Sequence, residues 1–529
     1  LGVLGAGQGT LGRHRRVAGE AVQTLAAEPV GDVVEGVAGS AQSVGQFSGE
    51  SGIEHSTRLP RVSGSVLLRR VRIVELDAAH IARAAAIDLL IERGVITALG
   101  PALARPSGVD EIDAAGRWAM PGLWDAHVHA GQWVRTARMV PLGTAARAED
   151  VLAAVAQAAP SVAHGATVLG FGYRSASWPR PGTVAELDAV SAGRPVVLVS
   201  GDAHNGWLNS LAFDLLGAPR RTGPVSENEW FSLLRRLDDL PRAAPQAADF
   251  VGPMAGLAAL GVTGLVDFEF ENSFLDWPVR ISAGADSLRV RTSVYPHQLD
   301  EVIGLGLRGG EPLPGGAGLA VMGPLKIISD GSLGSRTAWT HEPYSDGPAT
   351  PEHPCGQSNY GSDELHSLLT RAKDEGLEVA LHAIGDRANS VAVHAFSATG
   401  ARGSIEHAQL IADSDLRRMG ALGVRASVQP AHLLDDRDLT ERVWRDRAHL
   451  AFPLRSMLLA GVELRFGSDA PVAELNPWLA IATAVHRSGD DRAGWHPEQS
   501  LTVRESLAAS VDGRRLAVGA PGDVVLLDE

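Results

Sequence analysis

Short β-rich runs alternate with Ala- and Leu-rich helical stretches through most of this 529-residue chain. Eight such runs can be counted, at residues 124–129, 264–268, 290–295, 325–330, 378–382, 404–407, 425–429 and 464–469. Strands that alternate with helices form parallel βα units, because each helix returns the chain to the same end of the sheet. Eight units are what a (β/α)8 barrel requires. The sequence therefore predicts an α/β fold with a TIM-like barrel over residues 121–499.

Other segments interrupt or flank the predicted barrel. The long stretch after the first run contains extra β-like runs, which indicates an inserted subdomain at about residues 135–255. Short β-rich runs near both ends of the chain predict a small β-sandwich domain built from residues 63–120 and 500–529. Residues 1–62 lack sustained periodicity, so we expect a flexible N-terminal extension. The G-x-G-x-x-G pattern at residues 7–12 lacks the preceding strand that a dinucleotide site needs.

Charge and composition exclude several classes of protein. The net charge of −15 argues against broad binding to nucleic acid or to an anionic membrane. No apolar run approaches the roughly 20 residues that cross a bilayer, and the N-terminus lacks the pattern of a signal peptide. The single cysteine, Cys355, allows no intrachain disulfide. We expect a cytoplasmic protein that acts on a small molecule, binds neither nucleic acid nor membrane, and could form homo-oligomers.

Metal-binding or reactive side chains lie at the ends of the predicted strands. They are His127, His129, Lys326, His382, His407 and Asp469. The carboxyl ends of barrel strands form the active site, and alternate residues of a strand face the same side. His127 and His129 can thus hold one ion, and the two later histidines a second. Imidazole suits zinc and related ions, so we expect one or two divalent ions, with zinc as the metal.

Lys326 is one of only two lysines among 47 basic residues, the other being Lys373. Two cations about 4 Å apart need an anionic bridge, and an ammonium group would repel them. A carbamate, formed from an unprotonated lysine amine and carbon dioxide, is a bidentate anion that could provide this bridge. Arginine cannot form one. The alternative is that Lys326 is a buried lysine paired with an acid.

Several motifs resemble the amidohydrolase superfamily. Residues 120–129 (MPGLWDAHVH) are similar to its first-strand signature. Residues 325–338 (LKIISDGSLGSRTA) resemble more specifically its YtcJ-like branch, the amidohydrolase 3 group that includes N-substituted formamide deformylase. Residues 381–386, 405–408 and 466–471 complete the series, and residues 202–210 resemble a further branch motif in the inserted subdomain. The resemblance covers about residues 64–529.

The resemblance implies a metal-dependent hydrolase of carbon–nitrogen bonds other than peptide bonds, with a TIM-like barrel. It also implies that the six strand-end residues are the metal ligands. A metal-activated hydroxide would be the nucleophile, because bound ions lower the pKa of water to near neutrality. Asp469 would act as the catalytic base toward the attacking water and then as the acid toward the leaving nitrogen.

Four further residues are candidates for substrate contact or for support of the ligands. They are Asp330, Arg336, His204 and Trp207. Each has an alternative interpretation: Asp330 could form a turn with the following glycine, Arg336 a surface ion pair, and Trp207 part of a core. His432, His486 and His496 have no motif around them and stay unassigned.

Two other functions remain open. The same pair of ions could serve a lactone, ester or phosphoester hydrolase. A non-catalytic homologue used for binding is the third interpretation, although such proteins usually lose metal ligands and all six are present here.

Overall fold

The computed structural model describes residues 64–77, 85–175, 178–200, 205–234, 236–270, 272–348 and 351–527. The predicted extension at residues 1–62, with its glycine-rich pattern, lies outside these ranges. None of the helices within them combines the length and the apolar composition needed to cross a bilayer.

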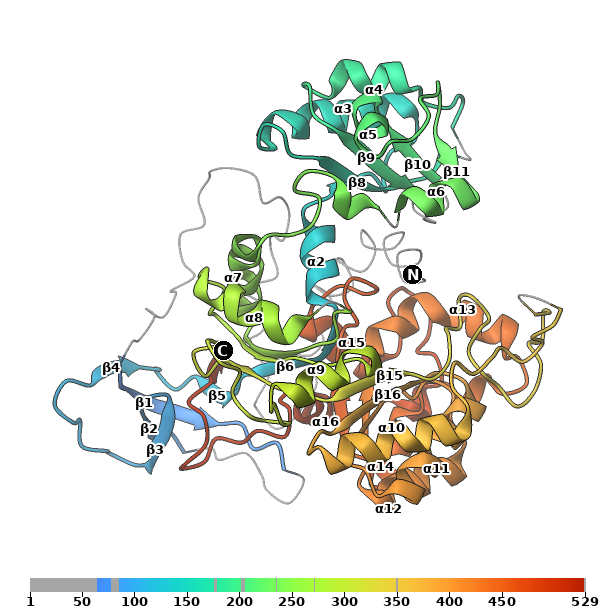
Figure 1. Cartoon of the computed structure of the whole chain (residues 1–529). Coiled ribbons are helices and arrows are strands. Elements are labelled where there is room, and N and C mark those ends of the chain that lie inside the picture. Colours follow the sequence, from blue (N-terminus) through green and yellow to red (C-terminus); the bar gives the residue numbers. More distant parts are fainter. Residues whose placement is uncertain are drawn as a thin grey trace.

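Both ends of the described chain contribute to one six-stranded sheet. Its strands are β1 (Val66–Ile73), β2 (Ile87–Glu92), β3 (Val95–Gly100), β4 (Asp110–Asp113), β5 (Trp118–Pro121) and β20 (Val524–Leu527). The strand order is β20-β5-β1-β2-β3, with β4 beside β1. β20 runs antiparallel to β5 and places Val525 opposite Met120. This pairing brackets everything between β5 and β20 (Figure 1).

A second, five-stranded sheet lies within the segment predicted as an insertion. It contains β7 (Val140–Pro141), β8 (Val168–Tyr173), β9 (Val196–Ser200), β10 (Asn205–Leu208) and β11 (Val225–Ser226). The helices α3 (Ala148–Ala158), α4 (Val184–Val190), α5 (Ser210–Leu215) and α6 (Glu227–Leu234) accompany it. Figure 1 shows this sheet and its helices set apart from the remaining strands. Its apolar side chains form clusters of their own, which is typical of a subdomain.

The remaining strands form two wholly parallel sheets. One contains β6 (Leu123–Val128), β12 (Val262–Asp267), β13 (Arg289–Arg291) and β14 (Ala320–Val321). The other contains β15 (Leu325–Ile328), β16 (Val379–Ala383), β17 (Gly403–His407), β18 (Arg425–Val428) and β19 (Leu464–Phe466). Each of the eight runs predicted as strands overlaps one of these strands.

Helices connect the parallel strands and lie outside them (Figure 1). They are α2 (Ala130–Ala137), α7 (Val251–Ala259), α8 (Ser273–Ser282), α9 (Leu299–Gly304), α10 (Ser362–Asp374), α11 (Asp386–Thr399), α12 (Asp413–Leu422), α13 (Leu433–Val443), α14 (Leu454–Leu459), α15 (Pro477–His486) and α16 (Val503–Ala509). In α10, Leu365, Leu369 and Ala372 recur at helical spacing and are buried. They join the strands in one apolar core, which holds the carboxyl ends of the strands in place.

The edges of the two parallel sheets meet through backbone hydrogen bonds. The amide of Lys326 donates to the carbonyl of Val294 at 2.8 Å, which links β15 to the segment after β13. At the other edge, the amide of His129 donates to the carbonyl of Ala470 at 2.9 Å, which links the end of β6 to the segment after β19. His127, His129, Lys326 and Asp469 thus lie where the two sheets meet, whereas His382 and His407 lie on β16 and β17 within the second sheet.

Candidate metal centre

Asp469 lies between two imidazoles supplied by the first parallel strand. His127 is the next-to-last residue of β6, and His129 directly precedes α2. They are 1% and 5% exposed. Their Nε2 atoms lie 3.5 and 3.4 Å from Oδ1 of Asp469. Ligand atoms around a tetrahedral zinc ion with bonds of about 2.1 Å are about 3.4 Å apart. These three side chains therefore fit a metal ion, and their donor atoms all lie within 4.8 Å of one another.

The backbone holds the Asp469 carboxylate in this position. Its amide donates to the carbonyl of His127 at 2.6 Å. Asp469 has a φ of +56°, in the left-handed region that non-glycine residues seldom adopt. Such strain is typical of functional sites whose surroundings over-determine the geometry. The preceding Gly467 permits the close approach, because a Cβ at that position would lie 2.6 Å from the backbone nitrogen of His127.

Buried neighbours set the orientation and charge of His127. Its Nδ1 lies 2.7 Å from Oε2 of Glu406, and both side chains are 1% exposed. Ser404 donates to the other oxygen of Glu406 at 2.5 Å. A carboxylate at Nδ1 leaves Nε2 as the donor atom toward a metal. Burial, with the nearby Lys326, holds the pKa of His127 well below its usual value, so the imidazole is neutral, as a ligand must be.

Aromatic rings line the same side of the centre. The ring of Phe268 lies 4.5 Å from that of His127, and Phe270 stacks on His129 at 5.2 Å. Both phenylalanines follow β12, the neighbour of β6. The two phenylalanine rings restrict the movement of the imidazoles and make this side of the centre apolar.

Lys326 lies on β15 and is 1% exposed. Its Nζ lies 3.3 Å from Nε2 of His127 and 4.3 Å from the centroid of the Phe268 ring. Among the described residues, no carboxylate lies within the 4.0 Å limit of an ion pair with this amine. The alternative of a lysine paired with an acid therefore finds no partner there. Burial lowers the pKa of Lys326 to about 8, although Glu406 and Asp469 act in the opposite direction.

Three more histidines meet on the far side of Asp469. The ring of His407 lies 4.5 Å from that of His382 and 6.2 Å from that of His432. Nε2 of His382 lies 3.1 Å from the carbonyl oxygen of Gly331. The donor atoms of His407, His432 and Asp469 lie within 4.8 Å of one another. The structure thus brings all six predicted ligand residues to one place and adds His432, for which no motif gave a signal.

Glu406 is a second residue that the sequence analysis did not single out. It lies inside the quoted motif at residues 405–408, directly before a predicted ligand. Strict alternation along a strand would place it opposite His407. His407 has a φ of +71°, outside strand geometry, so both side chains reach the centre. The motif at residues 405–408 was the available signal for Glu406. The left-handed conformation of His407 could not be read from that motif.

The four candidates for substrate contact have other partners or are not described. Buried Asp330 accepts hydrogen bonds from the amides of Trp339, Ile384 and Gly385 at 2.9 to 3.1 Å, and it also lies 3.4 Å from Nε2 of His382. These contacts support the end of β16.

Arg336 and Trp207 have contacts that match their alternative interpretations. Arg336 forms an ion pair with Asp346 at 2.7 Å. Trp207 is 0% exposed, and its indole donates to the carbonyl of Thr183 at 3.0 Å within the core of the inserted sheet. His204 lies outside the described residues.

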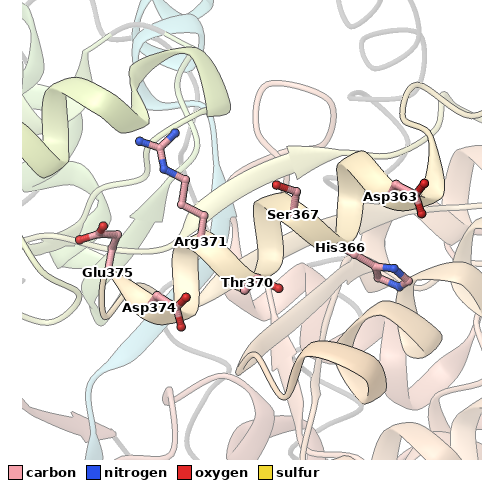
Figure 2. Close-up of a pocket in the computed structure, with 7 residues that line it drawn as sticks. All are labelled: Asp363, His366, Ser367, Thr370, Arg371, Asp374 and Glu375. Carbon is pink, nitrogen blue, oxygen red and sulfur yellow. The ribbon is translucent and has the colours of Figure 1, made fainter.

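A separate surface hollow lies along the outer helix α10 (Figure 2). Its lining residues are Asp363, His366, Ser367, Thr370, Arg371, Asp374 and Glu375. All come from this one helix or the residue after it, and none is a predicted ligand. The predicted ligands therefore lie in the buried histidine cluster and not along this hollow.

A parallel α/β fold whose strands end in imidazoles and a carboxylate is the arrangement expected of a metal-dependent α/β enzyme. The chain belongs to the amidohydrolase family, whose family model matches residues 110–529.

Relatives with known names extend this finding. The chain is 30% identical over 450 residues to protein LONG AFTER FAR-RED 3 of Arabidopsis thaliana. The matched region covers 76% of this chain and 74% of that protein. It is 26% identical over 429 residues to YtcJ of Bacillus subtilis (strain 168), covering 76% and 80%. It is 24% identical over 444 residues to N-substituted formamide deformylase of Arthrobacter pascens, covering 75% and 78%. The predicted membership of the YtcJ-like branch is confirmed.

A solved structure of a metal-dependent hydrolase from Pyrococcus furiosus is similar in fold. It shares 27% sequence identity and a TM-score of 0.75 with this chain, and the match covers 88% of this chain and 99% of that one.

Proposed function

We propose that this chain is a metal-dependent hydrolase that cleaves the carbon–nitrogen bond of a small amide or formamide outside peptides. The observation that carries the proposal is the position of the Asp469 carboxylate, between the imidazoles of His127 and His129 on one side and those of His407 and His432 on the other. The resemblance to N-substituted formamide deformylase supports the choice of bond.

The proposed architecture is a closed (β/α)8 barrel. The hydrogen bonds from Lys326 to Val294 and from His129 to Ala470 join the two parallel sheets at both edges and support closure. We further propose the domain boundaries expected from the sequence: a β-sandwich domain of residues 63–120 and 500–529, and an insertion at about 135–255. The sheet shared by β5 and β20 supports the first of these.

Most of the residues that would hold the metal are buried. His127, His129 and Asp469 would hold one divalent ion, which we expect to be zinc, and His382 and His407 would contribute to a second. When bound, such ions polarise a carbonyl and lower the pKa of water to near neutrality. Burial, together with His382, holds the pKa of His407 well below its usual value, so this imidazole is also in the ligand form.

Asp469 would move the proton during hydrolysis. Burial alone would raise the pKa of its carboxyl, but the surrounding imidazoles outweigh burial and hold the pKa well below the usual value. An ionised carboxylate can accept a proton from the attacking water and donate it to the nitrogen as the carbon–nitrogen bond breaks. The products would be a carboxylic acid, or formic acid, and an amine.

Lys326 would carry a carbamate. The ammonium would lose one proton to give the free amine, which would form a nitrogen–carbon bond with carbon dioxide and lose a second proton. A cation would thus become a bidentate anion. Three observations support this: the side chain is buried, no described carboxylate pairs with it, and burial lowers the pKa of its amine to about 8.

The test pairs metal analysis with a substrate panel. Full-length protein would be analysed for bound metal by mass spectrometry and then assayed with N-formyl and N-acyl amines, lactones, esters and phosphoesters. We expect bound zinc and turnover of the amides, both lost in His127→Ala and kept in His394→Ala, which alters an exposed residue of α11. Turnover restricted to lactones, esters or phosphoesters would overturn the proposed bond. A metal-free protein without turnover would favour a non-catalytic homologue.

A further inference from the structure

His432 is an unassigned imidazole that points at the centre. It ends the short 3-10 turn at Pro430–His432, directly after β18. Its Nε2 is buried, has no hydrogen-bond partner among the described residues, and lies 3.8 Å from Oδ2 of Asp469. A buried imidazole nitrogen without a partner is costly unless something else binds it.

The two oxygens of Asp469 face different histidines. Oδ1 lies 3.5 and 3.4 Å from His127 and His129, whereas Oδ2 faces His432. The separation of 3.8 Å on the second side is close to the roughly 3.4 Å expected between two ligands of one zinc ion. One carboxylate can therefore serve two positions.

His407 completes the second position. It ends β17, the strand beside β18, and its ring lies nearly parallel to that of His432, with an angle of 21° between the planes. Nδ1 of His407 is also buried without a hydrogen-bond partner among the described residues. By contrast, Nε2 of His382 already has the carbonyl of Gly331 at 3.1 Å.

We propose that His432 is a ligand of a second divalent ion, together with His407 and Oδ2 of Asp469. This assignment rests on the proposed function, because the ion is one of the two expected at this centre. His432 would join His382 and His407, the residues proposed above for the second ion, and would not replace either of them.

The experiment measures metal stoichiometry and affinity, not only turnover. Metal-free full-length protein would be titrated with zinc against a competing chelator. We expect two ions for the wild type and for His394→Ala. For His432→Ala we expect one ion at wild-type affinity, with the dissociation constant of the second at least about tenfold higher. His432→Asp, which supplies a carboxylate ligand, should recover part of the second ion, and thermal melting would show that each variant folds.

The outcomes separate this assignment from the proposed function. If His432→Ala binds both ions like the wild type, His432 is not a ligand, and a raised KM in that variant would make it a substrate contact instead. A wild type that binds one ion overturns the second position while leaving a metal-dependent hydrolase intact. A wild type that binds none overturns both proposals.

Discussion

Replacing Lys326 by arginine should abolish hydrolysis, although the positive charge is kept. A carbamate forms only on an amine that can lose its proton, and a guanidinium stays protonated in proteins. The side chain is 1% exposed and its Nζ lies 3.3 Å from Nε2 of His127, so the guanidinium would occupy the buried position that the carbamate needs. Lys326→Ala should likewise lose both activity and metal, and added short carboxylates should restore part of each.

The environment of the Lys326 amine determines how much of it is unprotonated and able to react with carbon dioxide. Burial lowers the pKa of Lys326 from 10.5 to about 8. At about pH 7.5, roughly a quarter of such an amine is unprotonated, compared with about 0.1% of an amine with a pKa of 10.5. Burial thus raises the reactive fraction roughly 200-fold. Because this fraction increases as pH rises through 8, carboxylation of the metal-free protein should become faster from about pH 6.5 to about pH 8.5.

The assay begins with metal-free protein in buffer depleted of carbon dioxide. Bicarbonate and zinc would then be added, and both activity and native mass would be followed. The wild type should gain the mass of one carbon dioxide as activity returns. Lys373→Arg is the matched control, because the chain's other lysine is exposed on α10 and donates to the carbonyl of Thr399. Near-wild-type turnover by Lys326→Arg would refute the carbamate, as would recovery that is independent of carbon dioxide.

Three further substitutions test separate parts of the centre and its surroundings. Asp469→Asn removes the proton acceptor and should lower kcat at least about a hundredfold, measured on whichever amide the wild type hydrolyses; an unchanged kcat would assign proton transfer elsewhere. Glu406→Gln weakens the hydrogen bond to Nδ1 of His127 and should raise the zinc dissociation constant about 10- to 100-fold in a chelator competition, an effect that Glu441→Gln on α13 should not show. Trp207→Ala empties a fully buried site and should cost about 3 to 5 kcal/mol of stability by denaturant unfolding, while metal content is unchanged; lost metal with normal stability would instead place Trp207 at the centre.

The strands and the residues at their ends could be predicted because periodicity is a local signal. Each β-rich run is short and bounded by helical sequence, and the carboxyl ends of parallel strands necessarily meet at one end of the fold. His127, Lys326 and Asp469 are far apart in the sequence, yet the topology of the parallel strands brings them together. The same rule explains why the shared sheet of β5 and β20 could be anticipated from β-rich runs at both ends.

The contacts that complete the centre depend on geometry that periodicity does not encode. His432 lies in a turn beyond β18, where no repeat predicts the direction of a side chain. His407 and Asp469 reach the centre through left-handed backbone conformations, with φ of +71° and +56°. Trp207 has a motif-like sequence context, but its burial results from the packing of the inserted sheet, which is a non-local property.

Four of the proposed ligands, His127, His129, Lys326 and Asp469, lie in the short segments that join the two parallel sheets. The hydrogen bond from Asp469 to the carbonyl of His127, and that from His129 to the carbonyl of Ala470, link β6 to the segment after β19. Lys326 makes the corresponding bond at the other edge, to the carbonyl of Val294. An ion held by these side chains would bind the folded junction and not the separated segments, so its binding free energy would add to the stability of the fold. In the proposed closed barrel, joining of the sheets and binding of the metal would therefore be one coupled equilibrium.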